Sequence, residues 1–370
     1  MKHSVACAEF GIKQKMQTEM LPTMVVPALL LGSVPLQDAQ SVFSAAAGLP
    51  LGTLSRFPDG ETGARSNWIG WQSRVFAAVP EFEPSPARER VYQLYPPFTL
   101  REAAHAKEVR FGPLGYAREA ISSYGIFREK KDRKEIPADA RFQIALPTPW
   151  APVYSFIAHR WQASIHSRYE QAMLAELDAI LAAIAHTELS ILWDVATEMS
   201  WWEGVYPAPF GNIARDEVEL AIVQSIAQLL NAVPKSVETG VHLCYGSMNN
   251  RHWKEPADCA NLVAVANALA AASARRIDYL HLPVPIARDD APYFAPLTAL
   301  KEGTCGELYL GLLHAKDGVE GAMRRIRCAR QFVKSFGIAC ECGLGRYPAE
   351  AIPGLLSLHG EVARAMQNGP

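Results

Sequence analysis

The chain has 370 residues, of which 49% are apolar, so it is long enough to bury one large core without dividing into two domains. Its 36 Lys and Arg residues stand against 38 Asp and Glu residues, and a formal net charge of −2 leaves no positive excess to hold a nucleic acid backbone. Seven cysteines, an odd number spread along a long chain, do not have the pattern of a disulfide-stapled secreted scaffold. We therefore expect a cytoplasmic protein that has no nucleic acid partner.

Residues 1–22 have no clear hydrophobic period, and we expect them to form a loose extension before a single domain that spans residues 23–370. The longest apolar run near the start, residues 24–32, is far shorter than the roughly 20 residues that a membrane helix needs. It begins with β-branched residues and is followed by Ser33, as in a buried strand that ends in a turn. The sequence thus predicts a first strand here and no membrane partner.

Eight short apolar runs that are bounded by turn residues predict eight strands, at residues 24–33, 52–57, 142–146, 189–194, 238–245, 277–282, 307–314 and 337–342. Helical periodicity between them predicts helices at residues 169–186, 215–230, 257–274, 319–335 and 348–366. Residues 68–139 are irregular and rich in Pro, Arg and aromatic side chains. We expect this segment to be an elaborated excursion after the second strand, with helices of its own.

Strands that alternate with helices indicate parallel βαβ units, and continuous apolar strands indicate an α/β sheet that is covered on both faces. Eight such units fit a closed (β/α)₈ TIM barrel, although an open doubly wound sheet would show the same pattern. In both folds, ligands bind where the carboxyl ends of the strands converge. Polar and titratable residues gather at these ends: Ser33, Asp59, Glu61, Asp194, His242, Cys244, His281, His314, Lys316, Cys340, Glu341 and Cys342.

His242 and Cys244 are the most specific of these residues. Residues two apart on a strand point to the same face, so the imidazole and the thiol can converge on one metal ion. A cysteine from the last strand completes a set of one nitrogen and two sulfurs, which suits zinc and leaves a fourth position open. Cys340 and Cys342 share a strand face, and spacing alone allows either of them. Spacing alone equally allows Cys244 and Cys342 to be ordinary buried cysteines that bind no metal.

Several motifs, in the same order, resemble the catalytic C-terminal barrel of cobalamin-independent methionine synthase, within the superfamily that includes uroporphyrinogen decarboxylase. Val-His-Leu-Cys-Tyr around His242 and Cys244 is similar to the family's His-Met-Cys-Tyr, and Glu-Cys-Gly-Leu around Cys342 is similar to its Asp-Cys-Gly-Leu. Both motifs supply zinc ligands in the family. The resemblance, over roughly residues 24–346, therefore implies a TIM-barrel enzyme that binds Zn²⁺ through Cys342 rather than Cys340.

Three further motifs imply where a substrate binds. Leu-Gly-Ser-Val-Pro around Ser33 looks like the family's Ile-Gly-Ser-Phe-Pro, where the Ser region holds the amino acid. Asp-Gly-Glu, which ends at Glu61, lies where the family has His-Gly-Glu, and that glutamate takes the substrate ammonium. Asp194 is similar to the acidic part of the family's Ile-Asp-Glu-Pro, with a register that is open by one residue. The resemblance implies homocysteine or a similar amino thiol, because a simple alkyl thiol would leave two buried carboxylates unpaired.

The chain departs from the family in two places. Where methionine synthase has a glutamate that completes the zinc shell, the nearest candidate is His281, either as a fourth ligand or as a hydrogen-bonding residue of the mouth. His314 aligns with the family's histidine that helps to protonate the folate nitrogen, but Ala315 and Lys316 replace its Ser-Pro. We expect His314 and Lys316 to be catalytic. The methyl donor, methylfolate or a methyl-corrinoid, stays open.

Aromatic residues after the fourth strand predict a loop over the mouth, which either stacks on a flat donor or seals the barrel: Trp201, Trp202, Tyr206 and Phe210. Trp150, just past the third strand, is a second candidate for stacking, although core packing is the ordinary role of such a residue.

The expected function is zinc-dependent methyl or alkyl transfer to an amino thiol. One alternative is a metal-independent lyase like uroporphyrinogen decarboxylase, which would need arginines at the mouth to bind a polycarboxylate; Arg56, Arg65 and Arg346 are the candidates. The other is a protein that binds zinc or a thiol without turnover, against which the substrate carboxylates Glu61 and Asp194 argue.

Overall fold

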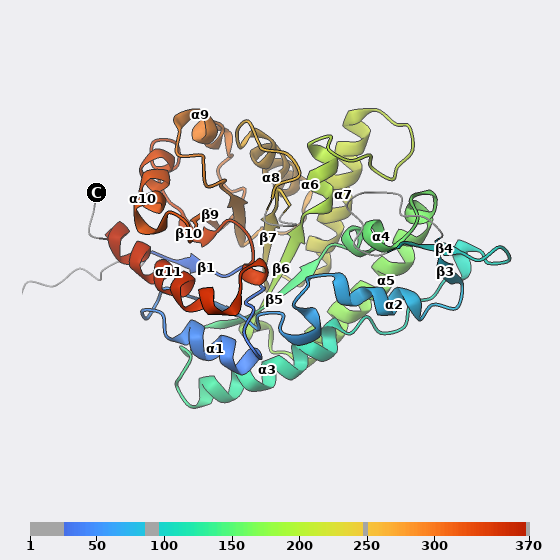
Figure 1. The fold of residues 1–370 in the computed structure, drawn as a ribbon, viewed down its shortest axis with the longest axis horizontal. Coiled ribbons are helices and arrows are strands. Elements are labelled where there is room, and N and C mark those ends of the chain that lie inside the picture. Colours follow the sequence, from blue (N-terminus) through green and yellow to red (C-terminus); the bar gives the residue numbers. More distant parts are fainter. Residues whose placement is uncertain (1–25, 86–95, 247–250, 368–370) are drawn as a thin grey trace, which may run out of the picture.

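The computed structural model describes residues 26–85, 96–246 and 251–367, so the extension expected over residues 1–22 lies outside the described residues. Eight parallel strands form one sheet (Figure 1). Hydrogen-bonded neighbours follow the order β1 (Ala28–Leu29), β10 (Gly337–Cys340), β9 (Glu307–Leu313), β8 (Tyr279–Pro283), β7 (Glu238–Leu243), β6 (Leu189–Val195), β5 (Arg141–Pro147) and β2 (Arg56–Pro58). Each predicted strand is present, with ends that shift by a few residues.

The two end strands of this order also approach each other. Isolated parallel bridges join Ala28 to Leu54 and Ser33 to Gly60, and the Val34 amide donates a hydrogen bond to Gly60 O at 2.9 Å. An open doubly wound sheet would leave these two edges far apart. The ring of strands is therefore nearly closed, and the predicted (β/α)₈ TIM barrel is confirmed.

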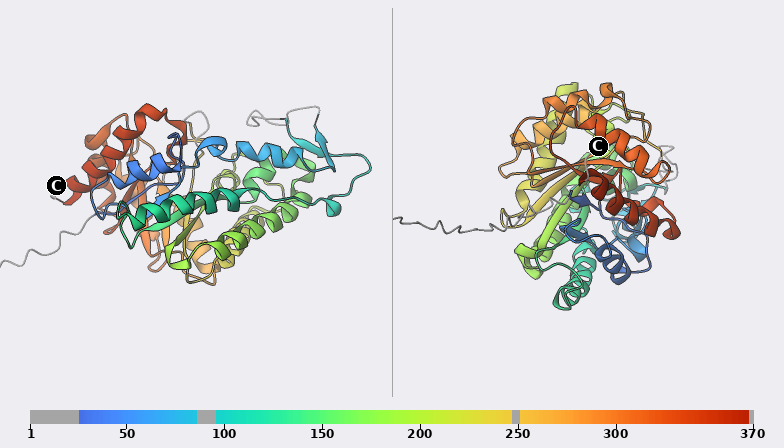
Figure 2. Two further views of the ribbon diagram at one scale, coloured as in Figure 1. Left: turned by 90° about the horizontal axis from the view of Figure 1, so that it is seen from below. Right: turned by 90° about the vertical axis from the view of Figure 1, so that its left-hand side faces the viewer.

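Helices surround the barrel in Figures 1 and 2, one after each strand of the ring. They are α1 (Ala39–Ala47), α3 (Tyr116–Asp132), α5 (His159–Ala183), α7 (Arg215–Ala232), α8 (Ala260–Ala272), α9 (Ala291–Phe294), α10 (Gly318–Ala329) and α11 (Ile352–Gln367). Among the described helices, none has both the length and the apolar composition that crossing a membrane requires.

Helix α5 begins at His159, well before the predicted start at residue 169. The buried face of its first turns carries Gln162 and His166, which are polar. Gln162 Nε2 donates hydrogen bonds to the carbonyl oxygens of Tyr154 and Ile157 at 3.1 and 2.8 Å. Because an apolar period cannot reveal a helix whose buried face is polar, the sequence places this start too late.

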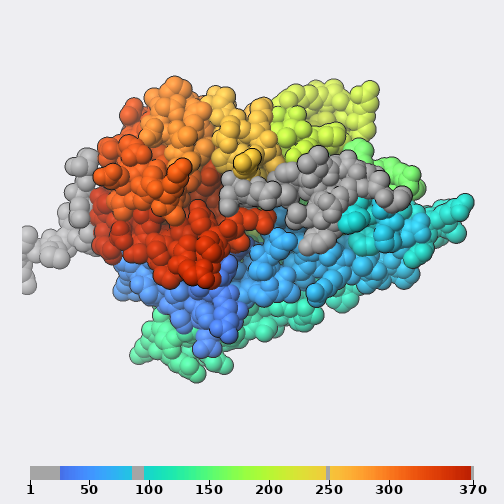
Figure 3. All heavy atoms as spheres, in the orientation of Figure 1, coloured from blue at the N-terminus to red at the C-terminus, as the bar shows by residue number. Residues whose placement is uncertain are grey.

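The excursion between β2 and β5 projects beyond one end of the barrel, as the left view of Figure 2 shows. It contains α2 (Ser73–Ala77) and an antiparallel pair, β3 (Phe82–Pro84) with β4 (Phe98–Leu100). The ring of Phe76 lies 5.3 Å from that of Tyr169 in α5 and 5.3 Å from that of Phe156 in α4 (Trp150–Phe156). Aromatic packing thus anchors the excursion to the helices α4 and α5. In Figure 3 the excursion and the C-terminal helix appear on the same face of the molecule.

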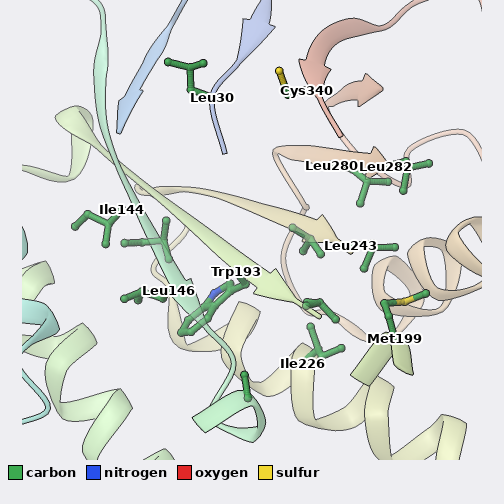
Figure 4. Packing of buried hydrophobic residues seen from close by; sticks show 14 of the residues in the cluster. Leu30, Ile144, Leu146, Trp193, Met199, Ile226, Leu243, Leu280, Leu282 and Cys340 are labelled. Atoms are coloured by element: carbon green, nitrogen blue, oxygen red, sulfur yellow. The ribbon is translucent and has the colours of Figure 1, made fainter. Parts of the chain in front are cut away.

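Neighbouring residues along a strand face opposite sides of the barrel wall. Trp193 packs outward with Met199 of α6 (Thr197–Trp202) and Ile226 of α7 (Figure 4). The residues between such positions form a separate cluster inside the barrel: Leu29, Leu31, Leu192, Tyr279, Tyr309 and Ala339. The barrel therefore has two separate apolar cores, one inside the ring of strands and one between the strands and the helices. Inward-facing side chains beyond the inner core, toward the carboxyl ends of the strands, point into the mouth of the barrel.

The floor of the barrel, at the amino ends of the strands, is polar. Arg56 is only 4% exposed, and its guanidinium forms 2.8 Å ion pairs with Glu238 and Glu307. The same group lies 4.1 Å from the centre of the Tyr279 ring and donates a hydrogen bond to the Tyr309 hydroxyl at 3.2 Å. One arginine of β2 thus contacts three other strands of the ring, β7, β8 and β9, at the end opposite the candidate site.

We expect Arg56→Met to lower the free energy of unfolding by about 2 kcal/mol. Removing one partner of a fully buried pair costs roughly 3–5 kcal/mol. We expect a loss below this range because the two glutamates are partly exposed, which weakens their interaction with Arg56. Urea denaturation measures the change. Arg101→Met is the matched control, since its pair with Glu83 is exposed, and it should change stability by less than about 1 kcal/mol. Equal effects of the two substitutions would contradict the prediction.

Candidate active site

Three polar side chains lie at one level of the barrel mouth. Asp194 pairs in register with His242, and His242 pairs with His281, on the adjacent strands β6, β7 and β8. Asp194 follows the inward-facing Leu192 by two residues, and His281 follows the inward-facing Tyr279 by two. The period of the strand therefore directs these side chains to the barrel interior, as expected from the sequence.

His242, Cys244 and Cys342 form a cluster that could hold a metal ion, with ligand atoms that all lie within 4.8 Å of one another. Cys342 Sγ lies 3.7 Å from Cys244 Sγ and 3.7 Å from His242 Nε2. Zn–S bonds of about 2.3 Å and Zn–N bonds of about 2.05 Å in a tetrahedron place two sulfurs about 3.8 Å apart, and sulfur and nitrogen about 3.6 Å apart. The two distances from Cys342 therefore match those of a tetrahedral zinc site, and the third pair of ligand atoms lies within 4.8 Å.

Cys340 does not join this cluster. Its side chain is buried with the outer core of the wall (Figure 4), and its Sγ lies 3.9 Å from Nε2 of His359 in α11. The expectation that Cys340 and Cys342 share a strand face is wrong, because β10 ends at Cys340 and its register shifts just before that residue. Cys342 follows the strand, so the period of two no longer applies to it.

A cavity of about 90 Å³ borders the cluster. Its walls include all three candidate metal ligands and all three residues that the sequence suggests for binding an amino acid: Ser33, Glu61, Asp194, His242, Cys244 and Cys342. These residues come from five different strand ends. The structure thus brings together six of the nine predicted site residues around one small space.

The turn after β2 places Glu61 in this cavity. Gly60 has a φ of +82°, and a Cβ there would lie 2.6 Å from Val42 Cγ2, so only glycine fits. Asp59 accepts a hydrogen bond from the Glu61 amide at 3.0 Å and forms an ion pair with Arg65 at 2.9 Å. Asp59 therefore shapes the turn, while the Glu61 carboxylate is left to face the cavity and accepts a hydrogen bond from the hydroxyl of Ser33.

Burial raises the pKa of both Glu61 and Asp194 to about 7. The hydrogen bond from Ser33 and the charge of Arg65 lower the pKa of Glu61 again in part. Asp194 Oδ1 has no hydrogen bond partner among the described residues. Two carboxyl groups at the wall of one small cavity favour a cationic ligand, because an ammonium supplies both the missing charge and hydrogen bond donors.

His281 is fully buried beside His242 and is not a member of the ligand cluster. Its Nδ1 lies 2.8 Å from His242 Nδ1, and its Nε2 lies 3.1 Å from Cys340 O. Both ring nitrogens are therefore engaged with protein atoms. Of the two roles that the sequence leaves open for His281, these contacts correspond to a hydrogen-bonding residue of the mouth.

A second cavity, of about 500 Å³, borders the same two cysteines, Cys244 and Cys342. His314 lines it and donates a hydrogen bond from Nε2 to Val284 O at 2.9 Å. Burial lowers the pKa of His314 to about 4, so its imidazole is neutral at pH 7. Lys316 is exposed in the turn after β9 and lines neither cavity, so the structure does not bring it to the predicted site.

The four aromatic residues predicted to cover the mouth do not line either cavity: Trp201, Trp202, Tyr206 and Phe210. Trp201 and Trp202 belong to α6 and are buried. Trp150 stacks on His166 with ring centres 3.7 Å apart and meets the Trp201 ring edge-on at 5.3 Å. Of the two expected roles, these contacts correspond to packing of the barrel rather than to stacking on a bound donor.

The cavity walls also include residues that the sequence did not single out, among them Trp68, Trp253 and His252. His252 Nε2 lies 2.8 Å from Glu341. Although burial lowers the pKa of His252, the carboxylates of Glu341 and Glu255 raise it to about 9, so it is cationic at pH 7. Arg346, in contrast, is one of the three arginines that the sequence suggests for a polycarboxylate, and it lines both cavities. Trp68, Trp253 and His252 lie in irregular segments, where no period indicates orientation.

No protein-family model and no curated protein matches this sequence. Among solved structures, a B12-independent methionine synthase from Shewanella sp. W3-18-1, in complex with selenomethionine, matches with a TM-score of 0.60 and 14% identity over 93% of this chain and 98% of that chain. A putative B12-independent methionine synthase from Listeria monocytogenes matches with a TM-score of 0.56 and 13% identity over 92% and 98%. The predicted resemblance is confirmed at the level of the fold: this chain has the barrel of the B12-independent methionine synthases.

Proposed function

We propose that the protein is a zinc-dependent enzyme that transfers a methyl group to the thiol of homocysteine or of a similar amino thiol. One observation carries this proposal. Two sulfurs and one nitrogen that lie close enough to share one metal ion border the same 90 Å³ cavity as two carboxyl groups suited to an ammonium. The complex of the Shewanella protein with selenomethionine supports an amino acid as the ligand of such a barrel.

Glu61 and Asp194 would bind the substrate ammonium, with Ser33 close to the same end of the amino acid. Held in this way, the amino acid extends its side chain toward His242, Cys244 and Cys342. A zinc ion held by these three residues would lower the pKa of the substrate thiol, so that thiolate would be available near neutral pH. Fixing the amino acid at its ammonium sets the direction from which its sulfur meets the donor.

The methyl donor would occupy the second cavity, which also reaches Cys244 and Cys342. In the transfer, a sulfur–carbon bond forms as the bond between the methyl group and the donor breaks, and the leaving group keeps that electron pair. Because His314 is neutral and its Nε2 proton is engaged with Val284 O, the cationic His252 is the better source of positive charge at this end. Lys316 has no part in the proposal.

A lyase that binds a polycarboxylate is the less well supported candidate. Arg56 lies on the floor of the barrel, and Arg65 is paired with Asp59. Only Arg346, of the three arginines that the sequence suggests, lines the cavities. In the 90 Å³ cavity, Arg346 is, among the described residues, the one arginine beside the two buried carboxyl groups Glu61 and Asp194, which is a poor site for an anion with several charges.

Methyl transfer to L-homocysteine tests the proposal, with methylfolate and methylcobalamin supplied in separate reactions. We expect methionine to form with one of the two donors, and a metal chelator to abolish its formation. Mass spectrometry of the product after transfer of a deuterated methyl group identifies the donor. Absence of methionine with both donors, from protein that holds zinc, would overturn methionine formation. Zinc with no thiol binding at all would favour a binding protein without turnover.

A further inference from the structure

A chain of hydrogen bonds runs behind the candidate metal cluster inside the barrel. It begins at Cys340 O, passes through both ring nitrogens of His281 and ends at His242, with contacts of 3.1 and 2.8 Å. The other ring nitrogen of His242, Nε2, faces Cys342 Sγ at 3.7 Å. Gly311 makes room for this arrangement, since a Cβ there would lie 3.1 Å from His281 Nε2 and 2.7 Å from Glu341 Cα.

The protons in this chain can be assigned from chemistry. A backbone carbonyl only accepts hydrogen bonds, so His281 Nε2 carries a proton and donates it to Cys340 O. His281 is fully buried, and no carboxylate of the described residues forms an ion pair with it, so a second proton would place an uncompensated charge in the barrel. Its Nδ1 is therefore an acceptor, and His242 Nδ1 must be the donor.

We propose that His281 is a positioning residue for the metal centre: it holds His242 in the tautomer that is protonated on Nδ1, so that the lone pair of Nε2 is directed at the metal. The inference rests on the proposed function, because it presumes that His242 is a metal ligand. Of the two roles that the sequence leaves open for His281, this inference assigns the hydrogen-bonding role and not that of a fourth metal ligand. A histidine that binds a metal commonly donates its other N–H to such a fixed acceptor.

His281→Leu and His281→Asn test this role together. Leucine removes the acceptor, and we expect the zinc dissociation constant, measured by competition with a chromophoric chelator, to rise roughly 10- to 100-fold. Asparagine can accept from His242 Nδ1 through Oδ1, near the position of His281 Nδ1, so it should keep the affinity within a few-fold of wild type. His166→Leu is the matched control for loss of a buried histidine, and it should not change zinc affinity, because His166 stacks on Trp150 away from the cluster.

The two possible roles of His281 predict different results. If His281 is itself a ligand, asparagine and leucine will weaken zinc binding alike, and X-ray absorption of the wild-type zinc protein will count two imidazoles instead of one. Either result would overturn the proposal, and the count on wild type decides even if His281→Leu fails to fold. Wild-type protein that binds no zinc refutes the proposed function together with this inference. Zinc binding without methyl transfer refutes only the proposed function, since affinity and ligand count need no turnover.

Discussion

Cys342→Ser is expected to weaken zinc binding by about 100- to 1,000-fold and to reduce methyl transfer accordingly. Binding of about 10–16 kcal/mol, shared among four ligands, assigns roughly 2.5–4 kcal/mol to each. A serine hydroxyl does not replace the thiolate, since soft sulfur ligands are what select zinc at such a site. Elemental analysis of the purified protein gives the zinc content per chain, and chelator competition gives the affinity.

Cys340→Ala is the control for this experiment. Cys340 is buried two residues before Cys342, but its side chain packs against α11 on the outside of the wall. Its backbone carbonyl, which accepts the hydrogen bond from His281, is kept by the substitution. We expect full zinc content in this variant. Zinc loss in Cys340→Ala alone, or equal zinc in both variants, would show that the ligand has been assigned to the wrong cysteine.

Glu61→Gln should raise the KM for homocysteine by about 10- to 100-fold, with a smaller change in kcat. A hydrogen bond to a charged group contributes roughly 1.5–3 kcal/mol, and the amide of glutamine keeps the shape of the side chain without its charge. An alkyl thiol that lacks the amino group is the matched comparison, because its KM should respond little to the substitution. An equal loss for both thiols would mean that Glu61 supports the fold of the site rather than the substrate ammonium.

The pH dependence of the same pair of proteins gives a second check. Burial raises the pKa of Glu61 to about 7, so below pH 7 the free enzyme carries more of the neutral carboxylic acid, which attracts an ammonium less. For wild type, kcat/KM for homocysteine should therefore fall as the pH drops through about 7. In Glu61→Gln this decline should be shallower, because one of the two carboxyl groups that titrate there, Glu61 and Asp194, is gone.

The barrel and most of its mouth could be predicted because the rules involved are local. Strands buried on both faces must be apolar throughout, so their positions are visible as runs in the sequence. The ordered motifs around Ser33, Glu61, Asp194, His242 and Cys342 then indicate which residues follow the strand ends, and the structure places all of them at one cavity. Nothing in this step depends on contacts between distant segments.

The features that the sequence does not predict correctly depend on local geometry and on contacts that hydrophobic periodicity does not reveal. The start of α5 is missed because its buried face carries polar residues, of which Gln162 donates hydrogen bonds to the carbonyl oxygens of Tyr154 in α4 and of Ile157, which follows α4. Cys340 and Cys342 do not share a strand face as expected, because β10 ends at Cys340. The engagement of His281 with His242 and Cys340 O depends on the space left by Gly311 on the next strand. Sequence spacing contains none of this information.

The closure of the barrel is uneven, since β1 has only two residues in the sheet and meets β2 through isolated bridges. Leu344, two residues after Cys342, donates its amide hydrogen bond to Ser33 O at 2.8 Å, just beyond β1. A metal ion held by His242, Cys244 and Cys342 would therefore cross-link two segments of the ring. It would fasten the end of β7 to the segment after β10, whose Leu344 amide is hydrogen-bonded to the residue Ser33 after the two-residue strand β1, so that metal binding would also stabilise this edge of the ring.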